Sequence, residues 1–298
     1  MKVRVGYGLG VRGPGVDGGR FGALVDGLEG LGFDSLWLSE RATGPIPDPL
    51  IGLSVAAGRT RRLKLGTSVQ VLPGRNPVLL AKEWATLDRL SNGRALPAFG
   101  LGVVEPVEQQ AFGVERADRA PLFDEALGIM RRLWTEETID HDGPRFHYEA
   151  VGIGIRPVQH PPDVWLGGRA PGELRRVGRL ADGWLPSFTT PELCVEGRAQ
   201  VEAAAAGAGR AIDPEHWGVL VPYAHGSVPD AVAQLVEQRL PGVDVRRVVA
   251  VGLDALRRQL EDYVAVGFSK LVTVPFEEPD DWDRELERLA DAVLDLQG

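Results

Sequence analysis

Residues 93–105 read Gly-Arg-Ala-Leu-Pro-Ala-Phe-Gly-Leu-Gly-Val-Val-Glu, a short apolar strand that runs directly into a glycine-containing loop. Three other apolar segments end in comparable loops, at residues 39–41, 68–70 and 167–169, and a helical pattern follows each of them. Loops at the C-terminal ends of parallel strands share one rim, which is where an α/β barrel builds its active site. The sequence therefore predicts a (βα)8 barrel whose functional residues lie in these loops.

The rest of the chain repeats the alternation of strand and helix. Strands are predicted at residues 3–9, 34–38, 63–69, 95–99, 164–166, 183–185, 217–222 and 271–274. A helix at 122–134 and a hairpin around Asp142-Gly143 interrupt the alternation, which indicates an insertion after strand four, at about residues 103–160. We expect one domain over residues 1–298, a TIM barrel with this helix-plus-hairpin insertion. A doubly wound open sheet is the alternative.

Composition excludes several classes of function. The chain of 298 residues has a net charge of -9, which argues against nucleic acid or an anionic membrane as the main partner. Cys194 is the only cysteine, so no internal disulfide forms, as in a reducing cytoplasm. The first residues enter a strand without an apolar signal segment, and no apolar run reaches transmembrane length. We expect a cytoplasmic protein that acts on a small molecule.

Two other motifs favour structural interpretations. Residues 8–13 match the dinucleotide fingerprint Gly-x-Gly-x-x-Gly, but Pro14 and Gly15 follow where that fingerprint needs a helix, which indicates a rim loop instead. Residues 140–149 contain two histidines and three acidic residues, yet the Asp142-Gly143 turn makes them the exposed face of a hairpin. No metal site is predicted. The lysines lie near strand starts or on a helix, so a Schiff-base mechanism has no support.

Two loops carry candidate chemistry. Glu40 ends strand two and could accept a hydrogen bond or a proton, while Arg41 beside it could hold an anion. The other loop contains Gly167, Gly168, Arg169 and Ala170 and immediately precedes a helix. Its glycines let a phosphate approach the backbone, and a helix N-terminus offers free N–H groups to that phosphate. Solvated charges and a plain strand-to-helix turn are the alternatives for these two loops.

Five segments resemble those of one known family. They are residues 34–40, 65–69, 86–94, 165–168 and 181–184, of which Thr-Leu-Asp-Arg-Leu-Ser-Asn-Gly-Arg at 86–94 is the most specific. The chain resembles the bacterial luciferase-like family of flavin- and deazaflavin-dependent oxidoreductases. This resemblance implies a TIM barrel with a tricyclic cofactor ring over its C-terminal mouth. It also implies a non-prolyl cis peptide at Ser68–Val69, behind the ring.

The resemblance further implies the cofactor and its contacts. The contexts of Ser39-Glu40 and Ser68-Val69 look most like the branch that uses the deazaflavin coenzyme F420, with flavin mononucleotide (FMN) as the alternative. The ring would pack against Ser68, Val69 and the loop that contains Gly100, Leu101 and Gly102. Arginines of the rim could bind its anionic groups, and they are Arg12, Arg41, Arg75, Arg116, Arg119 and Arg169. Family habit implies a homodimer through the helices after strands two and three.

This sequence departs from the family pattern at two places. Arg41 stands where several members have a histidine, and an arginine cannot act as a general base. Val103 and Val104 stand where sugar-phosphate dehydrogenases have an acid, so oxidation of a sugar phosphate is not expected. The expected function is hydride transfer between F420 and an organic substrate, with Glu40 near the reacting carbon and Trp184, Phe188 and Tyr223 shaping the substrate side.

Three other functions stay open. The first is an FMN-dependent monooxygenase that takes reduced flavin from a separate reductase. The second is a flavin-binding protein without catalytic turnover, which the arginine at position 41 keeps in consideration. The third is a cofactor-free barrel lyase, for which no catalytic lysine or metal set is visible.

Overall fold

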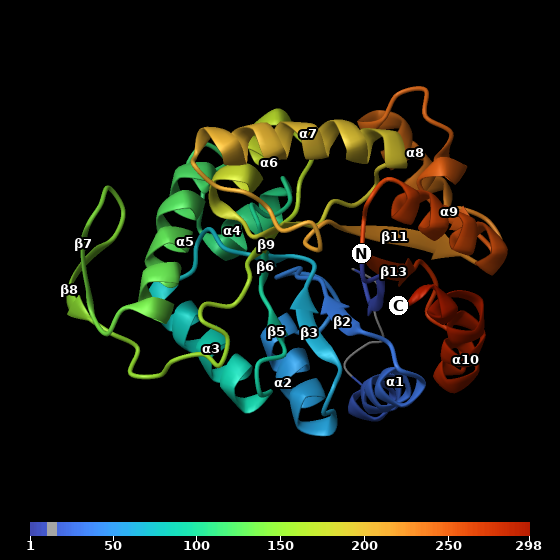
Figure 1. The fold of residues 1–298 in the computed structure, drawn as a ribbon, viewed down its shortest axis with the longest axis horizontal. Coiled ribbons are helices and arrows are strands. Elements are labelled where there is room, and N and C mark those ends of the chain that lie inside the picture. Colours follow the sequence, from blue (N-terminus) through green and yellow to red (C-terminus); the bar gives the residue numbers. More distant parts are fainter. Residues whose placement is uncertain (11–16) are drawn as a thin grey trace.

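The structure of the chain, a computed structural model, describes residues 1–10 and 17–298. In these residues, eight parallel strand positions surround a common axis (Figure 1). They are β1 (Arg4–Gly8), β2 (Ser35–Leu38), β3 (Lys64–Thr67) continued by β4 (Gln70–Val71), β5 (Ala95–Leu96) continued by β6 (Ala98–Gly100), β9 (Trp165–Leu166), β10 (Gly183–Trp184), β11 (Gly218–Ala224) and β13 (Lys270–Pro275).

The strand pairing closes the sheet on itself. One sheet has the order β12-β11-β13-β1-β2-β3-β5, in which β12 (Ala250–Val251) is an additional edge strand, and the other has the order β10-β9-β6-β4. Strands β5 and β6 are separated by one residue, so they join the two sheets on one side. Parallel bridges from Trp184 to Trp217 and from Ser187 to Leu220 join them on the other. The expected parallel α/β barrel is confirmed, and the open sheet is not observed in the described residues.

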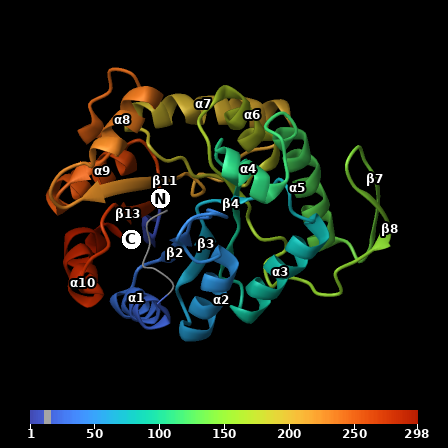
Figure 2. The ribbon, with the colours of Figure 1, turned by 180° about the vertical axis from the view of Figure 1, so that it is seen from behind.

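A ring of helices covers the outside of the strands (Figures 1 and 2). In chain order they are α1 (Gly18–Leu31), α2 (Pro49–Arg59), α3 (Pro77–Leu90), α5 (Arg119–Thr135), α6 (Pro171–Leu180), α7 (Pro191–Gly207), α9 (Leu253–Ala265) and α10 (Trp282–Val293). Three of them, α2, α3 and α7, begin at a proline that follows a capping side chain. Asp48 accepts the N–H of Ile51 at 3.1 Å, and Asn76 accepts that of Val78 at 2.9 Å. Proline fits the first helical position because the N–H group that it lacks would have no partner there.

The segment after strand four differs from the expectation. Helix α5 was expected in an insertion, but it packs beside α3 and bonds to α6, so it belongs to the ring (Figure 1). The hairpin of β7 (Ile139–Asp142) and β8 (His147–Val151) extends away from the barrel. Elements that the sequence analysis missed are the short helix α4 (Pro106–Phe112), helix α8 (Asp230–Arg239), strand β12 (Ala250–Val251) and the 3₁₀ turns 245–247 and 294–296.

Large side chains fill the interior of the barrel below its C-terminal mouth. The rings of Trp37 and Trp165 meet edge to face with centroids 6.3 Å apart. Glycines leave the space for both rings, because a Cβ atom on Gly66 would lie 2.4 Å from Trp37 and one on Gly183 would lie 2.5 Å from Trp165. This packed layer fills the barrel below the C-terminal ends of its strands.

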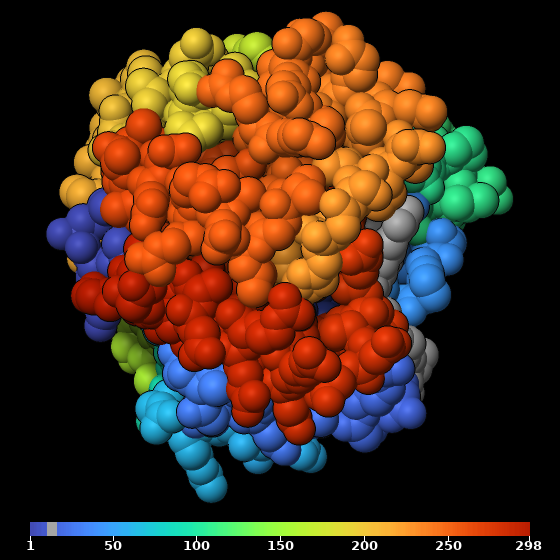
Figure 3. All heavy atoms as spheres, turned by 90° about the vertical axis from the view of Figure 1, so that its right-hand side faces the viewer, coloured from blue at the N-terminus to red at the C-terminus, as the bar shows by residue number. Residues whose placement is uncertain are grey.

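The C-terminal third of the chain covers one side of the barrel. Figure 3 shows its orange to red atoms, which include α9 and α10, spread over most of that face. None of the described helices is both long and apolar enough to cross a membrane.

Candidate active site

A cavity of about 640 Å³ opens at the C-terminal mouth of the barrel. It lies directly above the packed tryptophan layer, and residues from the ends of the strands and from the loops after them line it. Its volume is within the range of small-molecule and cofactor sites. The sequence analysis placed the candidate site at this rim, and the loops that it named do meet here.

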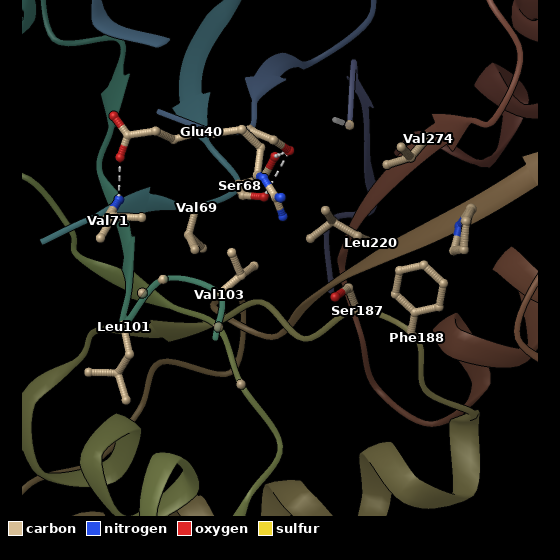
Figure 4. Close-up of a pocket in the computed structure, with 18 of the residues that line it drawn as sticks. Glu40, Ser68, Val69, Val71, Leu101, Val103, Ser187, Phe188, Leu220 and Val274 are labelled. Carbon is tan, nitrogen blue, oxygen red and sulfur yellow. Dashed lines mark hydrogen bonds between the residues drawn. The ribbon is translucent and has the colours of Figure 1, made fainter. Parts of the chain in front are cut away.

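The floor of the cavity contains the peptide bond between Ser68 and Val69, which is cis as the resemblance implied. Ser39 at the end of β2 lies beside it. Its hydroxyl donates to the carbonyl oxygen of Ser68 at 3.1 Å and is 3.3 Å from the Ser68 hydroxyl. In the close-up of Figure 4 the Val69 side chain points into the open space. Two hydroxyls and one apolar side chain therefore form this part of the site.

The loop at Gly100, Leu101 and Gly102 forms the adjacent wall. A Cβ atom on Gly100 would lie 2.4 Å from the side chain of Val69, so only glycine allows this close approach. Arg119 at the start of α5 fixes the loop, because its guanidinium donates to the carbonyl oxygens of Gly102 at 3.1 Å and Val103 at 2.8 Å. The wall therefore presents two positions without a side chain, Gly100 and Gly102, to the cavity.

Glu40 lines the cavity but directs its carboxylate away from the open space (Figure 4). One oxygen accepts the backbone N–H of Val71 at 2.6 Å, and the other is paired with Arg75. The side chain is 4% exposed. Burial raises the pKa of Glu40 above its ordinary value, although Arg75 and the Val71 amide favour the carboxylate. Through these contacts Glu40 holds β4 in place, directly after the cis peptide.

Arg41 is likewise held by acidic neighbours. Its guanidinium is 2.5 Å from the Glu105 carboxylate and 3.7 Å from that of Glu108. Burial disfavours the charge of Glu108, but its pKa is lowered because the side chain and amide of Thr43, the amide of Ala42 and Arg41 all stabilise the carboxylate. Arg41 thus joins the loop after β2 to helix α4, which the sequence analysis did not predict.

In the loop at Gly167, Gly168, Arg169 and Ala170, two backbone N–H groups are already bonded to a side chain of the protein itself. The carboxylate of Glu173 in the first turn of α6 accepts the N–H groups of Arg169 and Ala170, each at 2.9 Å. These are the groups that the sequence analysis offered to a phosphate. Gly167, Gly168 and Glu173 line the cavity. A phosphate that takes these N–H groups must first displace Glu173, an arrangement that the sequence did not reveal.

The rim arginines do not form a single free basic cluster. Arg75, Arg119 and Arg41 have the contacts given above, and Arg176 of α6 pairs with Asp124. Arg116 is exposed, and Arg12 lies outside the described residues. Burial lowers the pKa of Arg169, and the neighbouring charge of Arg239 lowers it further. Arg239 therefore lies close to Arg169 of the candidate phosphate loop, and it was not among the arginines predicted.

The opposite half of the cavity is lined mainly by apolar side chains. Phe188, Leu220 and Val274 face the open space in Figure 4. Phe188 has a φ of +50°, which is uncommon for a residue other than glycine. Helix α8 supplies Ala231, Leu235 and Arg239, at a spacing of four residues along one face. That spacing was the available signal for this missed helix.

Of the three aromatic residues expected on the substrate side, Phe188 lines the cavity and the other two belong to the core. The indole of Trp184 is buried and donates to the carbonyl oxygen of Gly168 at 2.9 Å. The Tyr223 hydroxyl is also buried and donates to Glu285 of α10 at 2.9 Å. Among the described residues no group of three or more histidine, cysteine or acidic side chains is placed to hold a metal ion.

The residues present fit a planar cofactor ring better than they fit its phosphate. The glycine backbone at 100 and 102 packs closely against Val69 and leaves a largely apolar wall without bulky side chains at these two positions, and a Cβ added at Gly100 would clash with Val69. Ser39 and Ser68 offer hydrogen bonds at its edge. At the phosphate loop, by contrast, the N–H groups already have a partner in Glu173.

Comparison with known proteins agrees with this geometry. The model of the luciferase-like monooxygenase family matches residues 6–292. A similar curated protein is the F420-dependent glucose-6-phosphate dehydrogenase of Kineococcus radiotolerans, which is 32% identical over 164 residues. The match covers 52% of this chain and 48% of that protein, so the chain spans about half the length of the curated relatives it matches.

Solved structures share the fold at low sequence identity. The coenzyme F420-dependent tetrahydromethanopterin reductase of Methanopyrus kandleri has a TM-score of 0.80 at 19% identity, and the match covers 100% of both chains. The oxygenating constituent of 3,6-diketocamphane monooxygenase from Pseudomonas putida, in complex with FMN, has a TM-score of 0.77 at 18% identity, over 98% of both chains. Since the family model matches nearly the whole chain, this protein belongs to the luciferase-like monooxygenase family.

Proposed function

We propose that this protein is an oxidoreductase that transfers a hydride between the deazaflavin coenzyme F420 and an organic substrate. The observation that carries the proposal is the close approach of the cis Ser68–Val69 peptide to the glycine backbone at 100–102, inside a cavity of about 640 Å³. A similar curated relative is named as F420-dependent, as is a structure with the same fold. An FMN complex with this fold makes FMN the second candidate.

The bound deazaflavin would supply the chemistry of hydride transfer, and the chain would supply binding, orientation and the exclusion of water. The ring would lie on Val69 and the backbone of Gly100, Leu101 and Gly102. The hydroxyls of Ser39 and Ser68 would bond to its edge. The carboxylate of Glu40 acts through Val71 and Arg75, so we assign it to positioning the floor.

The cofactor phosphate would enter at the loop Gly167–Ala170, beside Arg169 and Arg239. Binding to the N–H groups of Arg169 and Ala170 would require the Glu173 carboxylate to move aside. The Glu173 carboxylate would therefore compete with the cofactor phosphate for these N–H groups. This competition would weaken binding of the phosphate but not binding of the ring.

A paired titration with F420 and FMN, followed by intrinsic tryptophan fluorescence and by calorimetry, tests the proposal. We expect micromolar or tighter binding of F420 and at least about tenfold weaker binding of FMN, a difference of about 1.4 kcal/mol. Preferential binding of FMN, with oxygen uptake when reduced FMN is supplied, would move the protein to the monooxygenases. Binding of neither would overturn the assignment of the cavity to a cofactor.

Gly100→Ala and Gly128→Ala give a matched pair of variants. An added methyl group at Gly100 would lie 2.4 Å from Val69, whereas nothing lies within 4 Å of one at Gly128 on α5. Gly100→Ala should lower the affinity for F420 at least about tenfold, because Val69 must shift within the surface that the ring contacts. Gly128→Ala should leave that affinity unchanged.

A further inference from the structure

We infer that the half of the cavity between Phe188, Leu220 and helix α8 is a chamber for an uncharged, mainly apolar substrate that carries one hydrogen-bonding oxygen, held by the hydroxyl of Ser187. This inference rests on the proposed function, because it names the substrate class for the same site. It separates this protein from the related F420-dependent glucose-6-phosphate dehydrogenase, whose name specifies a charged sugar phosphate.

The walls of the chamber come from four parts of the chain. They contribute Ser187 and Phe188 after β10, Leu220 and Pro222 of β11, Val232 and Leu235 of α8, and Val274, Pro275 and Phe276 at the end of β13. The rings of Phe188 and Phe276 are tilted against each other with centroids 6.3 Å apart. Figure 4 shows Leu220, Val274 and Phe188 around one open space, across from Val69.

Helix α8 is held in place by its own apolar contacts. Val232 and Val236 are buried in a cluster with Val248 and Val249, and Phe188 and Phe276 pack against this cluster. The helix therefore brings Leu235 to the cavity as part of a built wall. Its outer face is polar, with Gln234 and Glu237 exposed.

Charged side chains that line the cavity lie outside this chamber or already have partners. Glu40 and Arg41 pair with Arg75 and with Glu105, Glu108 binds the loop after β2, and Arg176 pairs with Asp124. Glu173 binds two backbone N–H groups. Arg239 also lines the cavity, but it lies at the exposed end of α8, where its charge is close to Arg169 of the phosphate loop. A charged group deep in the chamber would lose its hydration with no described ionic partner to replace it, which disfavours charged substrates.

Ser187 supplies the polar contact. Figure 4 shows its hydroxyl among the apolar side chains of the chamber. Within the described residues this hydroxyl makes no hydrogen bond, whereas the hydroxyls of Ser39 and Ser68 bond to one another's groups. A hydroxyl can both donate and accept, so it suits a carbonyl or a hydroxyl oxygen. Ser187 therefore fixes the oxygen end of the substrate.

Calorimetric binding of butanone, hexan-2-one, octan-2-one and octanoate, with and without F420, tests the substrate class. We expect affinity to rise about fourfold with each methylene group of the ketones, because each one buries further apolar surface. Octanoate should bind at least about tenfold more weakly than octan-2-one, because its charge must be desolvated. The inference would be overturned if the three ketones bound with equal affinity, or if octanoate bound more tightly than octan-2-one through Arg239.

Leu235→Asp and Gln234→Asp make a matched pair on α8. Both add one negative charge to the same helix, but the first faces the cavity and the second is exposed. Leu235→Asp should lower the affinity for octan-2-one at least about tenfold, and Gln234→Asp should not change it. Equal effects of the two variants would contradict the position of the chamber.

The role of Ser187 has a spectroscopic test. In Ser187→Ala we expect the affinity for octan-2-one to fall about fivefold, as for the loss of one neutral hydrogen bond. The infrared carbonyl stretch of bound, carbon-13-labelled octan-2-one should move to higher frequency, because its hydrogen bond is lost. An unchanged stretch would remove Ser187 from the inference.

The two cofactor conditions separate this inference from the proposed function. If ketones bind as expected but neither F420 nor FMN binds, the chamber stands and the proposed function fails. If F420 binds but the ketones all bind with equal affinity, the proposed function stands and the assignment of the chamber to an apolar substrate is wrong.

Discussion

The carboxylate of Glu40 accepts the backbone N–H of Val71 at 2.6 Å and thereby ties the end of β2 to β4, immediately after the cis Ser68–Val69 peptide. Its second oxygen pairs with Arg75, which also donates to the carbonyl oxygen of Val71 at 3.0 Å. Glu40 was expected near the reacting carbon as a chemical group. These contacts instead support a role in holding the floor of the cavity.

Replacement of Glu40 should therefore affect binding more than chemistry. Glu40→Gln keeps an acceptor for the Val71 amide, while Glu40→Ala leaves that N–H and Arg75 without their partner. We expect Glu40→Ala to reduce the free energy of unfolding by about 2 kcal/mol and Glu40→Gln by less. Chemical denaturation measures the first effect, and F420 titration measures the loss of affinity. A change in the pH profile of kcat in Glu40→Gln, without a loss of affinity, would instead indicate proton transfer by Glu40.

Removal of the Glu173 carboxylate should favour phosphate-bearing ligands. FMN and riboflavin carry the same ring, but only FMN has the phosphate. We expect Glu173→Ala to tighten the binding of FMN about fivefold relative to riboflavin, because two N–H groups at the start of α6 become free for an anion. Glu196→Gln, on the exposed face of α7, serves as the control for loss of one charge. An unchanged ratio of the two affinities in Glu173→Ala would place the phosphate elsewhere.

Asp34 should contribute to the free energy of unfolding in a way that depends on pH in the acid range. It binds Lys270 at 2.7 Å and Lys64 at 3.1 Å near the N-terminal ends of the strands. Burial opposes its charge, but Lys270 and Lys64 outweigh this effect and lower the pKa of Asp34 to about 2. Asp34→Asn should reduce the free energy of unfolding by about 3 kcal/mol at neutral pH, because the ammonium of Lys270 would stay buried without its partner.

The sign of the pH effect follows from the lowered pKa of Asp34. The carboxylate stabilises the fold fully above its ordinary pKa, and this contribution disappears as the pH falls from about 4 to about 2. The difference in stability between the wild type and Asp34→Asn should therefore shrink over that interval. Denaturation at a series of pH values measures it, and a constant difference would contradict the assignment. Asp283→Asn, on the exposed face of α10, is the control.

We propose that the protein forms a homodimer through α2 and α3. These helices expose large apolar side chains, Ile51 and Val55 on α2 and Leu79 and Leu90 on α3. Apolar residues grouped on a surface favour association with a complementary surface. Ile51→Asp combined with Leu79→Asp should convert a dimer to a monomer in sedimentation velocity experiments. Val195→Asp, an equally apolar but separate exposed residue of α7, should not. A monomeric wild type would refute the proposal.

The sequence predicted the barrel because its determinants are local. The strand and helix patterns recur along the chain, and α5 (Arg119–Thr135) covers the helix expected at 122–134. The loops at 39–41, 68–69, 100–102 and 167–168 were expected to meet because parallel strands place their C-terminal ends on one rim. The family and the cis peptide at Ser68–Val69 followed from short motifs with a specific resemblance.

Only the tertiary structure decided what each side chain in those loops contacts. Glu40 accepts the backbone N–H of Val71, and Arg41 pairs with Glu105 and Glu108. Glu173 accepts the N–H groups that were expected to be free for a phosphate. Helix α8 and its Leu235 entered the site from a segment that carried no motif. The physical reason is that a charged side chain takes the partner that folding brings closest, and the partners of Glu40 and Arg41 lie thirty-one to sixty-seven residues away in the sequence, at separations that no local pattern encodes.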